Sequence, residues 1–72
     1  MARVLHLLKG DASLAVDVIA AQAGAGDEVT VAVLEGEAPA LPAGVIVRRL
    51  DADVDYGALV DLIFAADQVV PW

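Results

Sequence analysis

The residues that could do chemistry in this chain are few and lie far apart in the sequence. Covalent catalysis needs an activated nucleophile with a base beside it, but there is no Cys, and Ser13 is the only Ser. His6 is the only His, and the nearest acid in the sequence is Asp11. A general base or a metal ligand at His6 is conceivable, but a partly buried structural histidine is favoured. We therefore predict no catalytic residue, no metal site and no cofactor.

The most site-like segment follows the first apolar run and consists of Lys9, Gly10, Asp11 and Ser13. The N–H groups of a helix N-terminus together with a lysine can hold a small anion. The segment is neither a P-loop nor a GxGxxG motif. A turn followed by a helix cap is favoured, with Asp11 or Ser13 as the cap. A small-anion or nucleotide-binding module built on these four residues remains the rival functional hypothesis.

A second cluster of polar residues follows Arg48 and Arg49, where Asp51, Asp53 and Asp55 alternate. The spacing resembles the first ligands of a calcium loop, but the central Gly and the closing Glu are missing. We predict that Asp53 or Asp55 caps a helix, because acids at a helix N-terminus complement its dipole. The two arginines are expected at a solvated strand end or paired with these acids.

Composition excludes several classes of partner. The net charge is −7, from eleven acids against four cations. Binding to a nucleic-acid backbone requires clustered Lys and Arg, and so does binding to an anionic membrane surface, so we expect neither. No apolar run reaches the roughly 18 residues of a membrane span. We expect a cytoplasmic protein, and the lack of Cys is compatible with a reducing compartment.

Hydrophobic patterning predicts six elements in the order β-α-β-β-α-β, within a single domain spanning 1–72. Their apolar runs are short for the strands and continuous over the helices, and Gly or Asp residues lie at most of the boundaries. The expected strands are 4–8, 28–34, 45–50 and 69–72, with a loop at 35–44. The first helix is expected over the apolar residues 14–23 and ends at Gly24 and Gly26, and the second is expected over the apolar residues 58–66.

Two folds fit this order. One is an antiparallel ferredoxin-like sheet with both helices on one face. The other is a small α/β fold with a four-stranded parallel sheet in the order 2-1-3-4 and one helix on each face. We favour the parallel sheet, because strands 4–8 and 28–34 are apolar on both sides, as in strands covered on both faces.

Two stretches resemble the DsrH/TusB family. Near the start these are Leu5-His6, then Gly26-Asp27-Glu28-Val29, then Leu34-Glu35-Gly36. Near the end they are the segment Val54-Asp55-Tyr56 with the helix that it opens, and the closing segment from Asp67 to Trp72. The likeness covers roughly the first 36 and the last 22 residues, and the middle of the family's chain, including a helix before the third strand, has no counterpart here.

The resemblance implies a parallel α/β sheet of the DsrE/DsrH type and oligomeric complexes that pass sulfur between proteins. Such complexes serve wobble-uridine thiolation of tRNA or sulfur oxidation. Members of this branch often carry a Cys in the first helix, where this chain reads Val18-Ile19-Ala20-Ala21. The resemblance therefore implies a non-catalytic subunit or binding module that carries no sulfur itself. Its partners would be DsrE/DsrF-like or other Cys-bearing carrier proteins.

Self-association is the last expectation. One helix cannot cover a whole face of a four-stranded sheet, because a helix is about 10 Å across and four strands span roughly 15–19 Å. The apolar surface left beside each helix predicts a homodimer or a larger oligomer. The residues expected at the contact lie in the second helix and the last strand and are Leu62, Ile63, Phe64, Val69 and Trp72.

Overall fold

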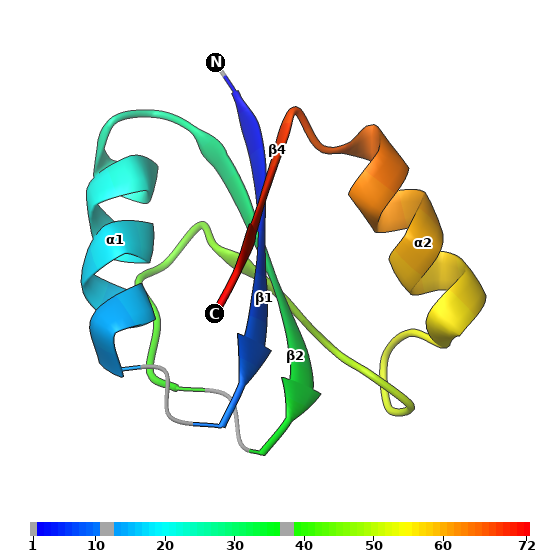
Figure 1. Cartoon of the computed structure of the whole chain (residues 1–72). Coiled ribbons are helices and arrows are strands. Elements are labelled where there is room, and N and C mark those ends of the chain that lie inside the picture. The colour runs from blue at the N-terminus through cyan, green and yellow to red at the C-terminus, as the bar shows by residue number, and fades with distance from the viewer. Residues whose placement is uncertain (1, 11–12, 37–38) are drawn as a thin grey trace.

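A computed structural model describes residues 2–10, 13–36 and 39–72 of the chain (Figure 1). The elements follow the expected order. Their bounds are β1 Arg3–Lys9, α1 Ser13–Gly24, β2 Glu28–Glu35, β3 Ile46–Arg49, α2 Tyr56–Ala65 and β4 Gln68–Pro71. Within these described residues no helix is long and apolar enough to cross a membrane.

The four strands form one all-parallel sheet in the order β3-β2-β1-β4. The α/β fold and the parallel sheet are confirmed, and the antiparallel ferredoxin-like alternative is excluded. The predicted order 2-1-3-4 is wrong. β3 pairs with β2, where Thr30 lies opposite Ile46, and β4 takes the free edge of β1, where Val4 lies opposite Gln68.

The link between β2 and β3 explains the difference in strand order. Its described residues contain no helix, and two of them, Leu41 and Val45, pack against the hydrophobic cluster beneath α1. A short link of this kind leads most directly to the edge next to β2, so it does not need to cross β1. Only the later link, which contains α2, crosses the sheet from the β3 edge to the β4 edge.

The two helices lie on opposite faces of the sheet (Figure 1). The crossover from β1 to β2 and the crossover from β3 to β4 run across the sheet in opposite directions. Two crossovers of the same handedness must therefore place their helices on opposite faces. We call the two faces of the sheet the α1 face and the α2 face, after the helix on each. Ala15 and Ile19 of α1 pack on Val31 and its neighbours, whereas Leu59 of α2 packs on Leu5 and Ala32.

Local sequence signals set the end of α1 and the beginning of α2. α1 ends in a Schellman motif, in which the Asp27 N–H donates to the Gln22 carbonyl and the Gly26 N–H to the Ala23 carbonyl. Gly26 has a φ of 91°, a left-handed conformation that suits glycine. α2 begins at an Asp55 cap, whose Oδ1 accepts a 2.8 Å hydrogen bond from the Ala58 N–H.

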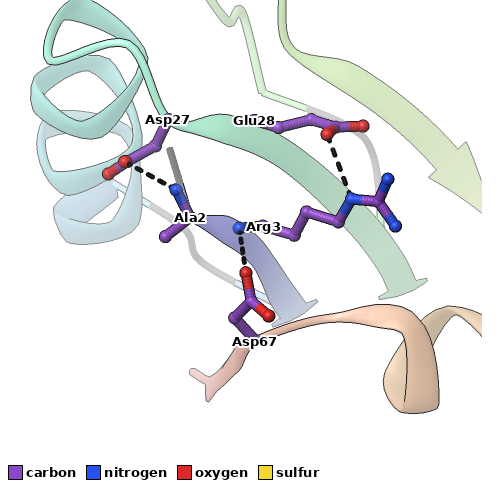
Figure 2. A network of polar contacts seen from close by, with 5 residues as sticks. All are labelled: Ala2, Arg3, Asp27, Glu28 and Asp67. Atoms are coloured by element: carbon purple, nitrogen blue, oxygen red, sulfur yellow. Dashed lines mark hydrogen bonds and ion pairs between the residues drawn. The ribbon is translucent and has the colours of Figure 1, made fainter.

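Acidic residues hold the N-terminal end of β1 from both neighbouring strands (Figure 2). The Ala2 N–H donates to Asp27 Oδ1 at 3.4 Å, just before β2 begins. The Arg3 N–H donates to Asp67 Oδ2 at 2.9 Å, just before β4 begins. Arg3 Nε lies 3.3 Å from Glu28 Oε2 across the β1–β2 pair. These contacts fix the register of the central strand against both neighbours at the same end of the sheet.

Candidate functional site

His6 lies in the middle of β1 and is fully buried on the α1 face. Both of its ring nitrogens are hydrogen-bonded. Nε2 lies 2.6 Å from Gln22 Oε1, in the last turns of α1, and Nδ1 lies 2.8 Å from Trp72 Nε1, at the C-terminal end. The His6 and Trp72 rings are also stacked, with centroids 6.0 Å apart and planes inclined by 21°.

The chemistry of Trp72 determines the tautomer of His6. The indole N–H can only donate, so Nδ1 of His6 must accept and carries no proton. The proton of the neutral ring therefore lies on Nε2, which donates to Gln22 Oε1. A histidine with both nitrogens engaged inside the core has no nitrogen free for a substrate or a metal. His6 was expected to be structural and partly buried, and the structure shows that it is completely buried.

The anion-site residues predicted after the first strand lie only partly within the described structure. Lys9 and Gly10 are exposed at the C-terminal end of β1, Ser13 begins α1, and Asp11 lies outside the described residues. In the observed order the chain reverses direction between β1 and β4, so the crevice that favours ligands lies there. The order 2-1-3-4 expected from the sequence would instead have put this crevice between strands one and three.

The alternating acids Asp51, Asp53 and Asp55 serve the turn between β3 and α2. Asp53 Oδ2 accepts from the Arg49 N–H at 2.9 Å, and Asp55 is the helix cap described above. Asp51 has a φ of 65°, the one described non-glycine residue in the left-handed region. Among the described residues no group of three His, Asp or Glu side chains is placed to bind a metal.

The expected contact residues fall into two groups. Leu62, Ile63 and Val69 pack against the cluster beneath α2 and are only partly exposed, whereas Phe64 projects into solvent with 83% of its surface exposed. Trp72 is bonded to His6 on the α1 face. Phe64 belongs to the helix on the α2 face, and Trp72 remains 41% exposed at the end of the edge strand β4.

Sequence reasoning predicted only Phe64 from a stripe of apolar side chains on α2, and it missed the other two. Tyr56, Val60 and Phe64 follow one another at intervals of four residues and are 68%, 46% and 83% exposed. Residues at this spacing share one side of a helix. We call this set the α2 stripe. The helix is apolar nearly all round, so its sequence alone could not separate the side that packs on the sheet from the side left in solvent.

A second feature of the α2 face is a cavity of about 280 Å³ between α2 and the N-terminal halves of β1, β2 and β3. We call it the α2 groove. Its lining comes from three strands and one helix and comprises Arg3, Val4, Leu5, Glu28, Thr30, Ile46, Arg48, Leu62, Ala65 and Ala66. Alternation along the strands could have placed Arg48 and Ile46 on one face, but grouping them with Arg3 requires the strand order.

Comparisons with known proteins identify no relative of this chain. No protein-family model, no curated protein and no solved structure matches the chain.

Proposed function

We propose that this chain is a non-catalytic subunit or binding module that works by association with other chains, through the α2 stripe. The observation that carries the proposal is the exposure of Tyr56, Val60 and Phe64 together on one side of a helix. Two of the three are aromatic, a residue type enriched at the centres of protein interfaces. Phe64 has no polar atom, so its exposure to water is unfavourable until another surface covers it.

The first partner is a second copy of the chain. Side chains at intervals of four form a ridge, and two such ridges interdigitate when helices of two copies pack across each other. A twofold axis through this contact would place Phe64 of each copy on the stripe of the other. Asp61 is the only charged residue within α2, so the contact is formed mainly by uncharged side chains.

Charge gives this dimer a distinctive salt dependence. Each copy carries a net charge of −7, so the approach of two copies is opposed by long-range repulsion. Added salt screens that repulsion over about 10 Å at 0.1 M. Self-association should therefore strengthen between 20 mM and 300 mM NaCl. Binding to a basic partner chain would weaken over the same range.

The pathway assignment rests on the resemblance to the DsrH/TusB family and is part of the proposal. The parallel α/β sheet supports it. The chain has no Cys, so its role in a sulfur relay would be to hold a DsrE/DsrF-like or other Cys-bearing carrier. Incubation of the purified chain with thiosulfate or a persulfide donor should leave it without covalent sulfur. The same incubation with a bound carrier should label only the carrier.

Sedimentation of two matched variants tests the association. Phe64→Ser removes the most exposed aromatic of the α2 stripe, and Leu14→Ser removes a side chain of 75% exposure from α1, on the other face. We expect a dimer at micromolar concentration. Its dissociation constant should rise tenfold or more in Phe64→Ser, as at an interface hot spot, and less than threefold in Leu14→Ser. A wild-type monomer at 100 μM, or equal effects of the two substitutions, would refute self-association through this stripe.

The rival function, small-anion binding at Lys9, Gly10, Asp11 and Ser13, is favoured by one observation. The observed strand order places the crevice of the sheet at the C-terminal end of β1, where Lys9 is exposed and α1 begins. A phosphate titration followed by backbone amide shifts tests it. Shifts confined to 9–13 would support this function, and shifts that cluster elsewhere or do not appear would exclude it.

A further inference from the structure

The α2 groove exists because α2 covers only part of its face. Leu59 and its neighbours on α2 pack on Leu5 and Ala32, in β1 and β2. β3 lies at the far edge of the sheet, and Ile46 on this strand remains exposed. The cavity occupies the space between the C-terminal half of α2 and this uncovered strip. Its volume of about 280 Å³ lies at the lower limit of small-molecule sites, about 300 Å³.

Much of the lining of the groove is apolar. Leu5 and Ile46 come from the sheet, Leu62 and Ala65 come from α2, and Ala66 is the C-cap of that helix. No charged side chain lies among these five residues. The small side chains of the two alanines leave room on the helix side. A ligand that fills this part of the groove must therefore have an apolar body.

The polar edge of the groove is cationic, although the protein as a whole is acidic. Two of the four cations of the chain, Arg3 and Arg48, line it together with one acid, Glu28. Arg3 is paired with Glu28 at 3.3 Å (Figure 2). The Arg48 guanidinium makes a single 3.4 Å hydrogen bond to the neighbouring Val47 carbonyl, and no described carboxylate lies within ion-pair distance of it.

A guanidinium beside an apolar cavity defines the chemistry of the ligand. Arginine binds a planar carboxylate through two parallel N–H donors. One unpaired arginine suits one carboxylate, and the Thr30 hydroxyl in the lining can donate or accept a further hydrogen bond. We propose that the α2 groove binds a small amphipathic carboxylate, with the anionic group on Arg48 and the apolar body against Leu62 and Ala65.

This inference does not depend on the proposed association. The groove lies beside Leu62, Ala65 and Ala66, whereas the α2 stripe consists of Tyr56, Val60 and Phe64 on the exposed side of the helix. Ligand binding can therefore be measured in the Phe64→Ser variant as well as in the wild type. Loss of dimerisation without loss of ligand binding separates the two proposals.

The test is a titration with 3-phenylpropanoate, followed by the backbone amide spectrum of the full chain. We expect saturable shifts at Thr30, Ile46 and Ala65, with a dissociation constant on the order of 1 mM, as suits a ligand of this size in an open site. Two further probes test the contributions of the carboxylate and of the apolar group separately. The corresponding amide, 3-phenylpropanamide, keeps the apolar phenylethyl group but has no charge, and acetate keeps the charge but lacks the phenylethyl group. Both should bind at least fivefold more weakly.

The adjacent arginines provide a matched pair of variants. Arg48→Gln should weaken 3-phenylpropanoate at least fivefold, because it removes the charge and the paired donors. Arg49 is the next residue but does not line the groove, so Arg49→Gln should change the affinity less than twofold. Equal losses in the two variants would indicate attraction by overall charge and overturn the proposal.

Three other results would also overturn it. These are no shifts at 20 mM ligand, shifts centred outside the groove, and binding of the amide as tight as that of the acid. A filling variant, Ala65→Leu, gives an independent check, because it occupies the apolar end without changing charge. It should weaken binding while leaving the amide spectrum of the free protein well dispersed.

Discussion

The two faces of the sheet are built from the same strands, yet they are covered to very different degrees. On the α1 face six side chains of β1 and β2 are buried, namely Val4, His6, Leu8, Val29, Val31 and Val33. On the α2 face only Leu5 and Ala32 of these two strands are buried, and Arg3 and Glu28 remain exposed. Each face carries one helix (Figure 1), so the helix alone does not explain the difference.

Segments from distant parts of the chain complete the α1 face. The β2–β3 link contributes Leu41 and Val45, and the C-terminal end contributes Trp72 over His6. The α2 face receives no comparable cover in the described structure, and it retains both the α2 groove and the α2 stripe. The face left open is therefore where we place both proposed interactions.

The largest expected effect is a cavity on the α1 face. Ile19→Ala removes a fully buried side chain and should lower the free energy of unfolding by about 3–4 kcal/mol. Leu62→Ala on the α2 face removes a partly exposed one and should cost about 1–2 kcal/mol. Urea unfolding followed by circular dichroism measures both. If Ile19→Ala does not fold, Ile19→Val should still cost about 0.5–1.5 kcal/mol. Equal costs at the two sites would contradict the contrast between the faces.

A smaller effect is expected at the buried histidine. Trp72→Phe keeps an aromatic ring but removes the indole donor, so Nδ1 of His6 loses its partner inside the core. The loss should be about 1–2 kcal/mol. Tyr56→Phe on the exposed stripe is the control and should change stability by less than about 0.5 kcal/mol.

The nitrogen resonances of His6 give a second check on the same contact. A long-range ¹⁵N–¹H spectrum of the folded protein should show a protonated Nε2 and an unprotonated Nδ1, as the donor-only indole requires. The opposite tautomer would mean that Trp72 does not donate to His6. In that case Trp72 would not cover His6 on the α1 face through this hydrogen bond.

The start of α2 should contribute about as much as a typical helix cap. Asp55→Ala removes the acceptor of the Ala58 N–H and should cost about 1 kcal/mol. Asp61→Ala, in the exposed middle of the same helix, should change stability by less than about 0.5 kcal/mol. Thermal unfolding of the two variants side by side measures the difference. A similar loss in both would show that general acidity, rather than the cap, stabilises α2.

The smallest effect is expected at the edge of the groove. Arg48→Gln removes an exposed side chain whose one described hydrogen bond is to the neighbouring Val47 carbonyl, so stability should stay within about 0.5 kcal/mol of the wild type. A drop of more than about 1 kcal/mol would indicate that Arg48 holds the α2 face together. The groove would then be part of the folding core rather than a site left open for a ligand.

The sequence by itself determined the six elements, favoured the parallel sheet, and narrowed the cap of α2 to Asp53 or Asp55, of which the structure shows Asp55. These depend on information that is local in the chain. Apolar residues on both sides of a strand predict cover on both faces. An Asp followed by a continuous apolar run predicts the beginning of a helix. The burial of His6 was also anticipated in part, from its position between two leucines in the first strand.

Only the tertiary structure decided the strand order, the partners of His6 and the difference between the two faces. The order depends on which sheet edge each link reaches, and the composition of the 36–44 link does not specify that edge. The partners of His6 are 16 and 66 residues away in the sequence, beyond the range of any local pattern. The α2 groove brings Arg3, Arg48 and Ala65 together through nonlocal pairing, because parallel strands can adjoin only after a crossover has carried the chain back across the sheet.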